Sequence, residues 1–286
     1  MIKIAVASGK GGTGKTLIST NLAYIASKKM KVSLYDLDVE EPNSHLFLQK
    51  EEVQPVSVEM MIPVVNDDKC TYCGICSKVC EYHAIITLAQ NVMVFPELCH
   101  SCYGCLEMCP TGAISEGFKS IGEIFHSQND NLNLITGKLK VSESATTALI
   151  AKTKNEKSEN VKLAIYDSPP GTSCPVIEAT KDMDYIILVS EPTLFGVHDL
   201  DLVVQTIKQL NRPFGIIINK AEKNNTIIDD YCKENAIEII AKIPIQDEIA
   251  HTYARGGLIV ENVKGTEAVF EKLLHTVLAK AGGAVI

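Results

Sequence analysis

The sequence predicts an α/β protein with a doubly wound, mostly parallel sheet, into which a small α+β module is inserted. Three observations lead to this prediction. Short apolar segments typical of buried strands alternate with segments whose apolar residues recur at helical spacing. A glycine-rich segment separates the first strand from the first helix. Eight of the ten cysteines lie in two tight clusters, in a region without a helical period of ordinary length.

The first strand and helix are the segments MIKIAVAS and KTLISTNLAYIASKK, and the helix carries Ile18, Leu22 and Ile25 at helical spacing. The segment KVSLYDLD has the pattern of a second buried strand, with acidic residues at its carboxyl end. Open α/β sheets bind their ligands at this edge. The acidic residues are therefore candidates for a ligand site.

The remaining elements divide the chain into two predicted domains. Short apolar pieces around the cysteines fill residues 61–117, so we assign them to an inserted domain, and residues 1–60 and 118–286 to one discontinuous domain. After the insert, KSIGEIFHS and LNLITGKLK form a predicted hairpin, and the charged stretch KTKNEKSEN is predicted to be a solvated loop. Further strands are expected at VKLAIYD, MDYIILVS, RPFGIIIN and IEIIAKIP, with helices between them and a last helix near EAVFEKLLHTVLAKAG.

The composition favours a cytoplasmic protein that binds neither nucleic acid nor a membrane. The net charge of the 286 residues is −8, without the clusters of lysine or arginine that contact phosphates along DNA. The first residues lack the features of a secretory signal, and the apolar runs are much shorter than the roughly 20 residues that span a bilayer. Clustered cysteines in such a chain favour metal binding over disulfides.

Residues 8–16 read SGKGGTGKT and contain the pattern GxxxxGK[ST] between a predicted strand and a predicted helix. Glycines allow consecutive backbone N–H groups to surround phosphate oxygens, and a helix N-terminus favours negative charge. We expect Lys15 to contact the β- and γ-phosphates of ATP and the Thr16 hydroxyl to bind Mg²⁺. The predicted nucleotide-binding residues of this loop are Gly9, Lys10, Gly11, Gly12, Thr13, Gly14, Lys15 and Thr16.

The loop contains a second lysine, Lys10, which leaves it on the entry side and is poorly placed to reach a γ-phosphate bound by the same loop. The segment KGGTGKT resembles the deviant Walker A motif of the P-loop ATPases that include MinD, ParA and the nitrogenase iron protein. This resemblance implies a nucleotide-dependent homodimer, in which Lys10 crosses the interface to the partner's nucleotide and acts in catalysis with Lys15. A solvated surface lysine is the alternative.

Two further segments resemble the switches of this superfamily. LYDLDVEEPN resembles the first switch, which implies that Asp38 orients the attacking water, that Asp36 supports the magnesium shell and that Asn43 lies near the phosphates. Each of these acids alone would also fit a helix cap or a surface charge. IYDSPPG resembles the second switch, which implies that Asp167 binds magnesium through water and that Gly171 lets the backbone move near the γ-phosphate.

The roles of two residues in the predicted nucleotide domain each depend on a single resemblance. IIINK resembles the element beside the adenine base, which makes Asn219 the candidate for contacting the base. Cys174 follows the second switch motif, where the nitrogenase iron protein has a cysteine that helps to bind a cluster shared between subunits. The alternative for Cys174 is a buried structural thiol.

The two cysteine clusters repeat one spacing, CxxCxxCxxxC, which is typical of proteins that bind two [4Fe–4S] clusters. In two-cluster ferredoxins the fourth cysteine of each run ligates the other cluster. The spacing therefore predicts one cluster on Cys70, Cys73, Cys76 and Cys109 and the other on Cys99, Cys102, Cys105 and Cys80. Gly74 and Gly104 are expected to adopt turn conformations that larger residues resist.

The insert resembles bacterial two-cluster ferredoxins, with Glu81 where these usually have proline. Zinc is the alternative metal, although zinc sites usually use two separated CxxC pairs. We expect His83 and His100 to lie beside the clusters or on the surface and not to be ligands. The insert contains six acidic residues and two lysines, which fits either a basic redox partner or an ordinary soluble surface.

Together these motifs resemble MinD-superfamily ATPases that contain an inserted ferredoxin domain. The resemblance implies an ATP-hydrolysing iron–sulfur protein, in which nucleotide-driven dimerisation gates electron transfer through two [4Fe–4S] clusters to a metalloprotein partner. One alternative is a factor that assembles clusters or carries them to apo-proteins. The other is a spatial or partition switch, like MinD or ParA, whose clusters are structural.

Overall fold

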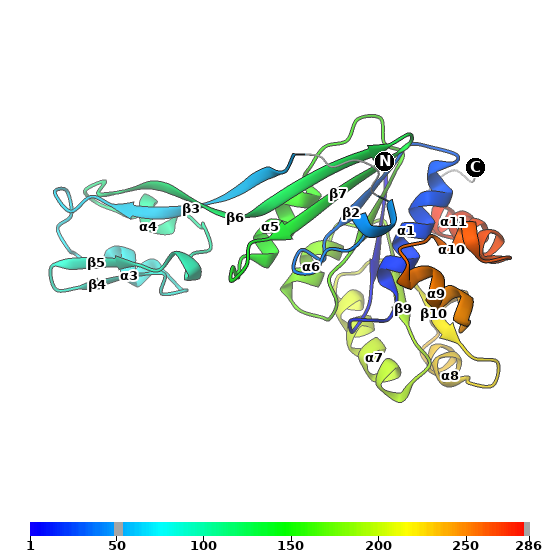
Figure 1. Ribbon diagram of the computed structural model, residues 1–286. Coiled ribbons are helices and arrows are strands. Elements are labelled where there is room, and N and C mark those ends of the chain that lie inside the picture. The colour runs from blue at the N-terminus through cyan, green and yellow to red at the C-terminus, as the bar shows by residue number, and fades with distance from the viewer. Residues whose placement is uncertain (49–53, 283–286) are drawn as a thin grey trace.

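The structure is a computed structural model that describes residues 1–48 and 54–282. Residues 49–53 and 283–286 belong to the predicted discontinuous domain and lie outside the described residues. The centre is a nine-stranded sheet in the order β11-β10-β9-β1-β8-β2-β7-β6-β3, with helices on both faces (Figure 1). The predicted doubly wound, mostly parallel sheet is confirmed.

Seven neighbouring strands of this sheet are parallel. They are β1 (Ile2–Ala7), β2 (Val32–Asp36), β7 (Leu132–Leu139), β8 (Leu163–Asp167), β9 (Tyr185–Ser190), β10 (Phe214–Ala221) and β11 (Ile239–Pro244). Every residue of β2, β8 and β9 is buried, because helices cover both faces. The strands predicted after the insert all form.

Each face of the sheet packs against its own group of helices, and each layer has its own apolar core. One core includes residues of α1 (Lys15–Ser27), α9 (Asp247–Ala254), α10 (Ile259–Asn262) and α11 (Thr266–Lys280), as well as Leu48 of the short α2 (His45–Leu48). The other includes residues of α5 (Thr146–Lys154), α6 (Cys174–Thr180), α7 (Leu194–Gln209) and α8 (Ile227–Glu234). The predicted helix after the glycine loop and the predicted last helix are confirmed.

The predicted solvated loop at KTKNEKSEN is wrong for its first three residues, which form the last turn of α5. Thr153 is fully buried and its hydroxyl donates to the Leu149 carbonyl at 2.9 Å. The buried threonine packs against β7 at Gly137, where an added Cβ would lie 2.5 Å from the Thr153 hydroxyl oxygen. Packing against the sheet therefore outweighs the high charge of this stretch.

The cysteine-rich region projects from one edge of the sheet on two long antiparallel strands, β3 (Val56–Val65) and β6 (Ile114–Asn129) (Figure 1). Both strands run without interruption through the predicted domain borders after residues 60 and 117. The hairpin of β6 with β7 is confirmed. The projecting part contains α3 (Ile75–Val79), β4 (Ile85–Leu88), β5 (Asn91–Val94), the single turn η1 (Pro96–Leu98) and α4 (Gly104–Glu107).

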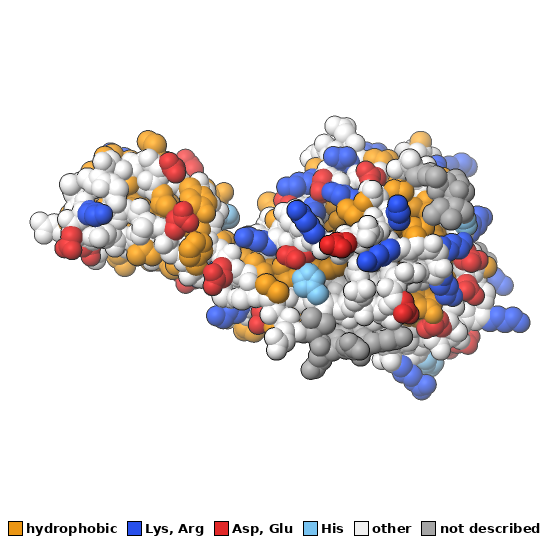
Figure 2. Space-filling view, turned by 90° about the horizontal axis from the view of Figure 1, so that it is seen from above, with side chains coloured by type: hydrophobic (Ala, Val, Ile, Leu, Met, Phe, Trp, Pro, Cys, Tyr) orange, Lys and Arg blue, Asp and Glu red, His pale blue; other side chains and the backbone are white. Residues whose placement is uncertain are grey.

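Seen from above, the projecting part is a separate lobe that carries several acidic and apolar side chains, whereas most basic side chains lie on the main body (Figure 2). This agrees with the excess of acidic residues in the insert. None of the helices in the described parts of the chain combines the length and apolar character that crossing a membrane requires.

Candidate functional site

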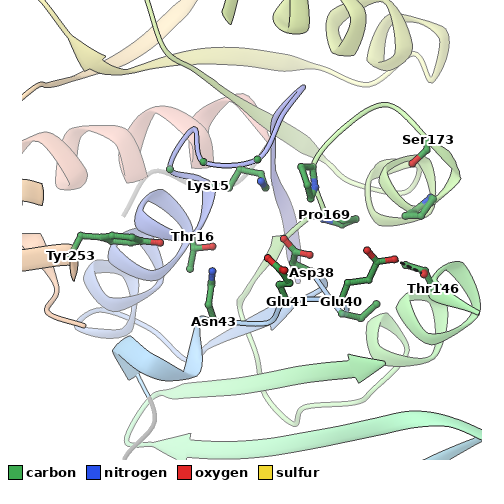
Figure 3. Close-up of a pocket in the computed structure, with 16 residues that line it drawn as sticks. Lys15, Thr16, Asp38, Glu40, Glu41, Asn43, Thr146, Pro169, Ser173 and Tyr253 are labelled. Atoms are coloured by element: carbon green, nitrogen blue, oxygen red, sulfur yellow. Dashed lines mark hydrogen bonds between the residues drawn. The ribbon is translucent and has the colours of Figure 1, made fainter. Parts of the chain in front are cut away.

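A cavity of about 520 Å³ opens where the loops after β1, β2 and β8 meet at the carboxyl edge of the sheet. Parallel strands direct their loops to this edge, so three segments that are distant in sequence share one hollow. Lys15, Thr16, Asp38 and Asn43 face it in the close-up view (Figure 3). Gly11, Gly12 and Gly14 complete its floor, and the loop after β8 adds Pro169, Pro170 and Ser173.

The glycine loop is shaped by close packing as well as by backbone freedom. Gly14 adopts φ 97°, and an added Cβ would lie 2.2 Å from Nδ2 of Asn219. The Asn219 amide donates to the Thr13 carbonyl at 2.7 Å, so Asn219 supports the loop from outside the cavity. Helix α1 begins directly after Gly14, which places its N-terminus and the buried Lys15 beside the hollow. This arrangement suits a phosphate group.

Asp36 and Asp167 are neighbours in the register of β2 and β8, and both are fully buried near the cavity floor. Both carboxylate oxygens of Asp167 lack a hydrogen-bond partner among the described residues. Burial, and next to it the charge of Asp36, raise the pKa of Asp167 to about 7, against the opposing charge of Lys15. A buried carboxylate with free oxygens beside Thr16 fits a hydrated magnesium ion.

The side chain of Asp36 holds the loop that follows β2. Its carboxylate accepts the N–H groups of Asp38 at 3.2 Å, Asn43 at 3.0 Å and Ser44 at 2.9 Å. Burial raises the pKa of Asp36, and these backbone bonds oppose the rise. The first-switch loop is therefore fastened at both ends to one buried side chain.

Asp38 lies on that loop and lines the cavity. Burial raises the pKa of Asp38 to about 6, although Lys15 lowers it. A carboxyl group with a pKa near neutrality can exchange a proton with a bound water at physiological pH. Asn43 lines the same hollow, and its buried Oδ1 has no hydrogen-bond partner among the described residues.

Lys10 does not line the cavity, because its side chain turns toward the loop after β9. Its Nζ lies 2.5 Å from Oε1 of Glu191, whose other oxygen is 3.0 Å from Nζ of Lys220. Lys220 also donates to the Gly12 carbonyl at 3.3 Å. Glu191 thus connects the second lysine of the glycine loop to β10.

Two other predicted residues act through their backbones in this structure. An added Cβ at Gly9 would lie 2.1 Å from the Asp199 carbonyl oxygen, so only glycine lets α7 approach the loop this closely. The N–H of Gly171 donates to the Ser8 carbonyl at 3.0 Å, which joins the second-switch loop to the glycine loop. Neither residue lines the cavity.

The projecting lobe brings together the cysteines that the spacing assigns to one cluster. Cys70, Cys73, Cys76 and Cys109 line a single small hollow, with apolar neighbours such as Val65, Ile75, Val92 and Ile114. Cys109 comes from the second run, so residues of both runs meet in this hollow. The burial of Cys105, with Cys99 and Cys102 contributing, raises the pKa of the Cys105 thiol to about 11.

The two cysteine runs adopt the same backbone path. The Cys70 and Cys99 sulfurs each accept the N–H two residues later, at 3.4 and 3.5 Å, and the Cys80 and Cys109 sulfurs each accept the N–H four residues later, at 3.2 and 3.3 Å. Left-handed residues recur at matching positions, namely Tyr72 and Ser101, Gly74 and Tyr103, and His83 and Gly112. N–H groups directed at sulfur favour thiolates and metal-bound sulfur.

The expected turn conformation is therefore confirmed for Gly74 and wrong for Gly104, which begins α4 while Tyr103 takes the left-handed position. The expectation failed because the second run has its glycine one place later than the first. His83 and His100 are exposed, and His100 stacks on Tyr82 with ring centroids 3.6 Å apart. Cys174 is exposed at the start of α6, so the alternative of a buried thiol is wrong, whereas Cys232 is buried in α8.

Within residues 1–48 and 54–282, no group of three or more His, Cys, Asp or Glu side chains is arranged to hold one metal ion. The thiols of a cubane site bind different irons, so they need not converge on one point. The four cysteines around the small hollow fit a cubane site, in which each thiol binds a different iron.

Comparisons with known proteins identify the family. The CobQ/CobB/MinD/ParA nucleotide-binding domain matches residues 4–259. The chain belongs to this family. An uncharacterized protein of Methanocaldococcus jannaschii is 32% identical over 254 residues, which cover 82% of this chain and 90% of that protein. The iron-sulfur cluster carrier protein of the same organism is 24% identical over 300 residues, covering 98% and 85%.

Among solved structures, the septum site-determining protein MinD of Pyrococcus horikoshii, complexed with Mg-ADP, has the same fold. Its TM-score is 0.61 at 18% identity, and the match covers 98% of this chain and 97% of that one. This match shows that the main body of the chain has a MinD-type α/β fold.

Sequence reasoning missed three residues of this MinD/ParA-family site. Glu191 binds Lys10, Tyr253 on α9 lines the cavity and stacks on Phe47 at 4.7 Å, and Thr146 at the start of α5 donates to Glu40. A local sequence signal exists only for Glu191, an acid directly after the strand YIILVS. The other two reach the cavity only through tertiary packing.

Proposed function

We propose that this protein is an ATP-hydrolysing iron–sulfur protein, in which a nucleotide-dependent homodimer gates electron transfer through two [4Fe–4S] clusters to a metalloprotein partner. The observation that carries the proposal is the hollow that Cys109 shares with Cys70, Cys73 and Cys76. It supports crossed ligation in a chain that also has a nucleotide-binding family domain. Zinc sites built on separated CxxC pairs would not require this crossing.

At the nucleotide site, the buried Lys15 is assigned to the β- and γ-phosphates. Thr16 and Asp167 are the residues that would hold Mg²⁺, which supplies charge neutralisation at the phosphates when bound. Asp38 orients the attacking water and Asp36 keeps the Asp38 loop in place through its three backbone bonds. Lys10 is assigned to the nucleotide of the second subunit, where an added cation would stabilise transition-state charge.

In the lobe, Cys70, Cys73, Cys76 and Cys109 would hold one cluster and Cys80, Cys99, Cys102 and Cys105 the other. The clusters supply one-electron redox chemistry, and their potentials depend on burial and on hydrogen bonds to sulfur. The backbone N–H groups directed at Cys70, Cys80, Cys99 and Cys109 supply such bonds. The acidic surface of the lobe favours a partner with a basic docking face.

A second candidate is a carrier that transfers clusters to apo-proteins. It is favoured by the similarity to the iron-sulfur cluster carrier protein of M. jannaschii and by the exposure of Cys73 and Cys102, which would let an acceptor thiol approach. A carrier must release its cluster, so the two candidates differ in whether the iron stays bound during turnover.

One experiment on anaerobically purified protein separates the candidates. The midpoint potentials of the clusters and the rate of electron donation to an external acceptor are measured with and without Mg-ATP. The gating proposal expects ATP to change at least one of them while the iron content stays constant, and it fails if both are unchanged. ATP-stimulated transfer of labelled iron to an apo-ferredoxin would instead support the carrier.

A further inference from the structure

Residues 139–146, which lead from the end of β7 into α5, contact both the nucleotide cavity and the cysteine lobe. We call this segment the connector. The connector begins at the last residue of β7, an interior strand of the sheet, and ends at the first residue of α5. Both of its ends therefore belong to the main body. Its middle reaches the lobe.

On the nucleotide side, both ends of the connector bind the first-switch loop. The N–H of Leu139 donates to the Val39 carbonyl at 2.7 Å, and the Thr146 hydroxyl donates to Oε1 of Glu40 at 3.0 Å. Val39 lines the cavity. Glu40 and Thr146 line it together with Asp38 (Figure 3). A movement of the loop that carries Asp38 therefore acts directly on the connector.

On the lobe side, the middle of the connector binds β6 and the turn η1 that precedes the second cysteine run. Nζ of Lys119 on β6 lies 2.9 Å from Oε2 of Glu143, and these side chains are only 18% and 11% exposed. Oε1 of Glu143 also accepts the N–H of Ser144 at 3.0 Å. The Ser144 hydroxyl then donates to the carbonyl of Glu97 at 3.2 Å, two residues before Cys99.

We infer that the connector is the positioning element through which nucleotide binding at the first switch alters the backbone around Cys99, and through which the lobe acts back on the nucleotide site. This inference rests on the proposed function and names the route of its regulation. Within eight residues, the connector binds the first-switch loop at both ends and the lobe in between, so a shift of the first-switch loop acts on the bond to Glu97. Linkage requires the coupling to be equal in both directions.

Hydrogen exchange measured by mass spectrometry on the full, cluster-loaded chain tests the inference, with and without saturating Mg-ADP. In the wild type, nucleotide should slow exchange in residues 9–16 and 37–44 and change exchange in residues 95–105. Ser144→Ala removes the bond to Glu97, and Thr146→Val removes the bond to Glu40. Both variants should show a response in residues 95–105 that is about fivefold smaller, the effect of one hydrogen bond of ordinary strength.

Thr146→Ser is the matched control, because it keeps the hydroxyl that donates to Glu40. It should respond like the wild type. Two results, each obtained while nucleotide protects residues 9–16, would overturn the role of the connector and leave the proposed function standing. One is that exchange in residues 95–105 of the wild type does not respond to nucleotide. The other is that this response is as large in either variant as in the wild type. Absence of protection in residues 9–16 of the wild type overturns the proposed function and the inference together.

Discussion

Nζ of Lys10 and Oε1 of Glu191 form an ion pair at 2.5 Å, which holds the second lysine of the glycine loop against its own chain. Partial burial alone would raise the pKa of Glu191, but its bonds to Lys10 and Lys220 hold that pKa below its usual range. Glu191 is therefore charged at neutral pH. If Lys10 serves the nucleotide of a second subunit, dimer closure must first break this pair.

Weakening the pair should favour the dimer. We expect Glu191→Gln to tighten ATP-dependent dimerisation by up to about fivefold, because a partly exposed ion pair contributes no more than about 1 kcal/mol. Analytical ultracentrifugation over a range of concentrations measures this change. In the Lys10→Ala background the same substitution should have no such effect, and an equal effect in both backgrounds would show that the pair does not restrain dimerisation.

Removing the Lys10 side chain should slow ATP hydrolysis and leave the affinity for ATP nearly unchanged. Lys10→Ala is expected to bind ATP within about threefold of the wild type, since the side chain lies outside the cavity. It should hydrolyse ATP at least about a thousandfold more slowly, the lower end of the range for a cation supplied in trans. Lys15→Ala is the comparison, because it should lose binding as well. Wild-type hydrolysis by Lys10→Ala would contradict the assigned role.

Asp167 should lower the stability of the nucleotide-free protein as pH rises. Its pKa is raised from 3.8 to about 7, so between these values the folded protein keeps a proton that the unfolded chain has lost. The free energy of unfolding then falls with rising pH across this window and levels off above it. The stability advantage of Asp167→Asn over the wild type should grow by on the order of 2 kcal/mol from about pH 5.5 to about pH 8.

Urea unfolding without magnesium or nucleotide, at both pH values, measures this difference. Asp130→Asn, at the exposed turn between β6 and β7, is the control and should follow the wild type. Added Mg-ATP should stabilise the wild type more than Asp167→Asn. An advantage independent of pH would mean that Asp167 does not carry the titration.

Cysteine substitutions should reveal crossed ligation. With two [4Fe–4S] clusters the chain binds about eight iron atoms, and Cys109→Ser should weaken the cluster of Cys70, Cys73 and Cys76 and lower the content toward about four. Cys80→Ser should weaken the other cluster. The EPR spectrum of the cluster that remains should therefore differ between Cys80→Ser and Cys109→Ser. Cys174→Ser should leave the iron content unchanged. If Cys109→Ser and Cys105→Ser gave the same remaining spectrum, the crossing would be wrong.

Most of the framework was accessible from the sequence. The glycine loop, the buried strands and the cysteine runs depend on short-range spacing, which determines local backbone geometry and available ligands. The strand IYDSPPG could be placed at the ligand edge because a parallel sheet collects its carboxyl ends there. The error at Gly104 shows the limit of this reasoning, because the left-handed conformation belongs to a position in the motif, here Tyr103, and not to a residue type.

By itself, the sequence determined which functional motifs the chain contains and their order: a phosphate-binding loop, acidic residues after buried strands, and eight cysteines in two runs of equal spacing. Only the tertiary structure decided that Glu191 binds Lys10, that Asp36 holds the first-switch loop, and that residues 139–146 lie between that loop and Cys99. The physical reason is that hydrophobic periodicity reports which face of an element is buried but not which distant side chain it meets. Such pairings follow from the packing of the whole sheet.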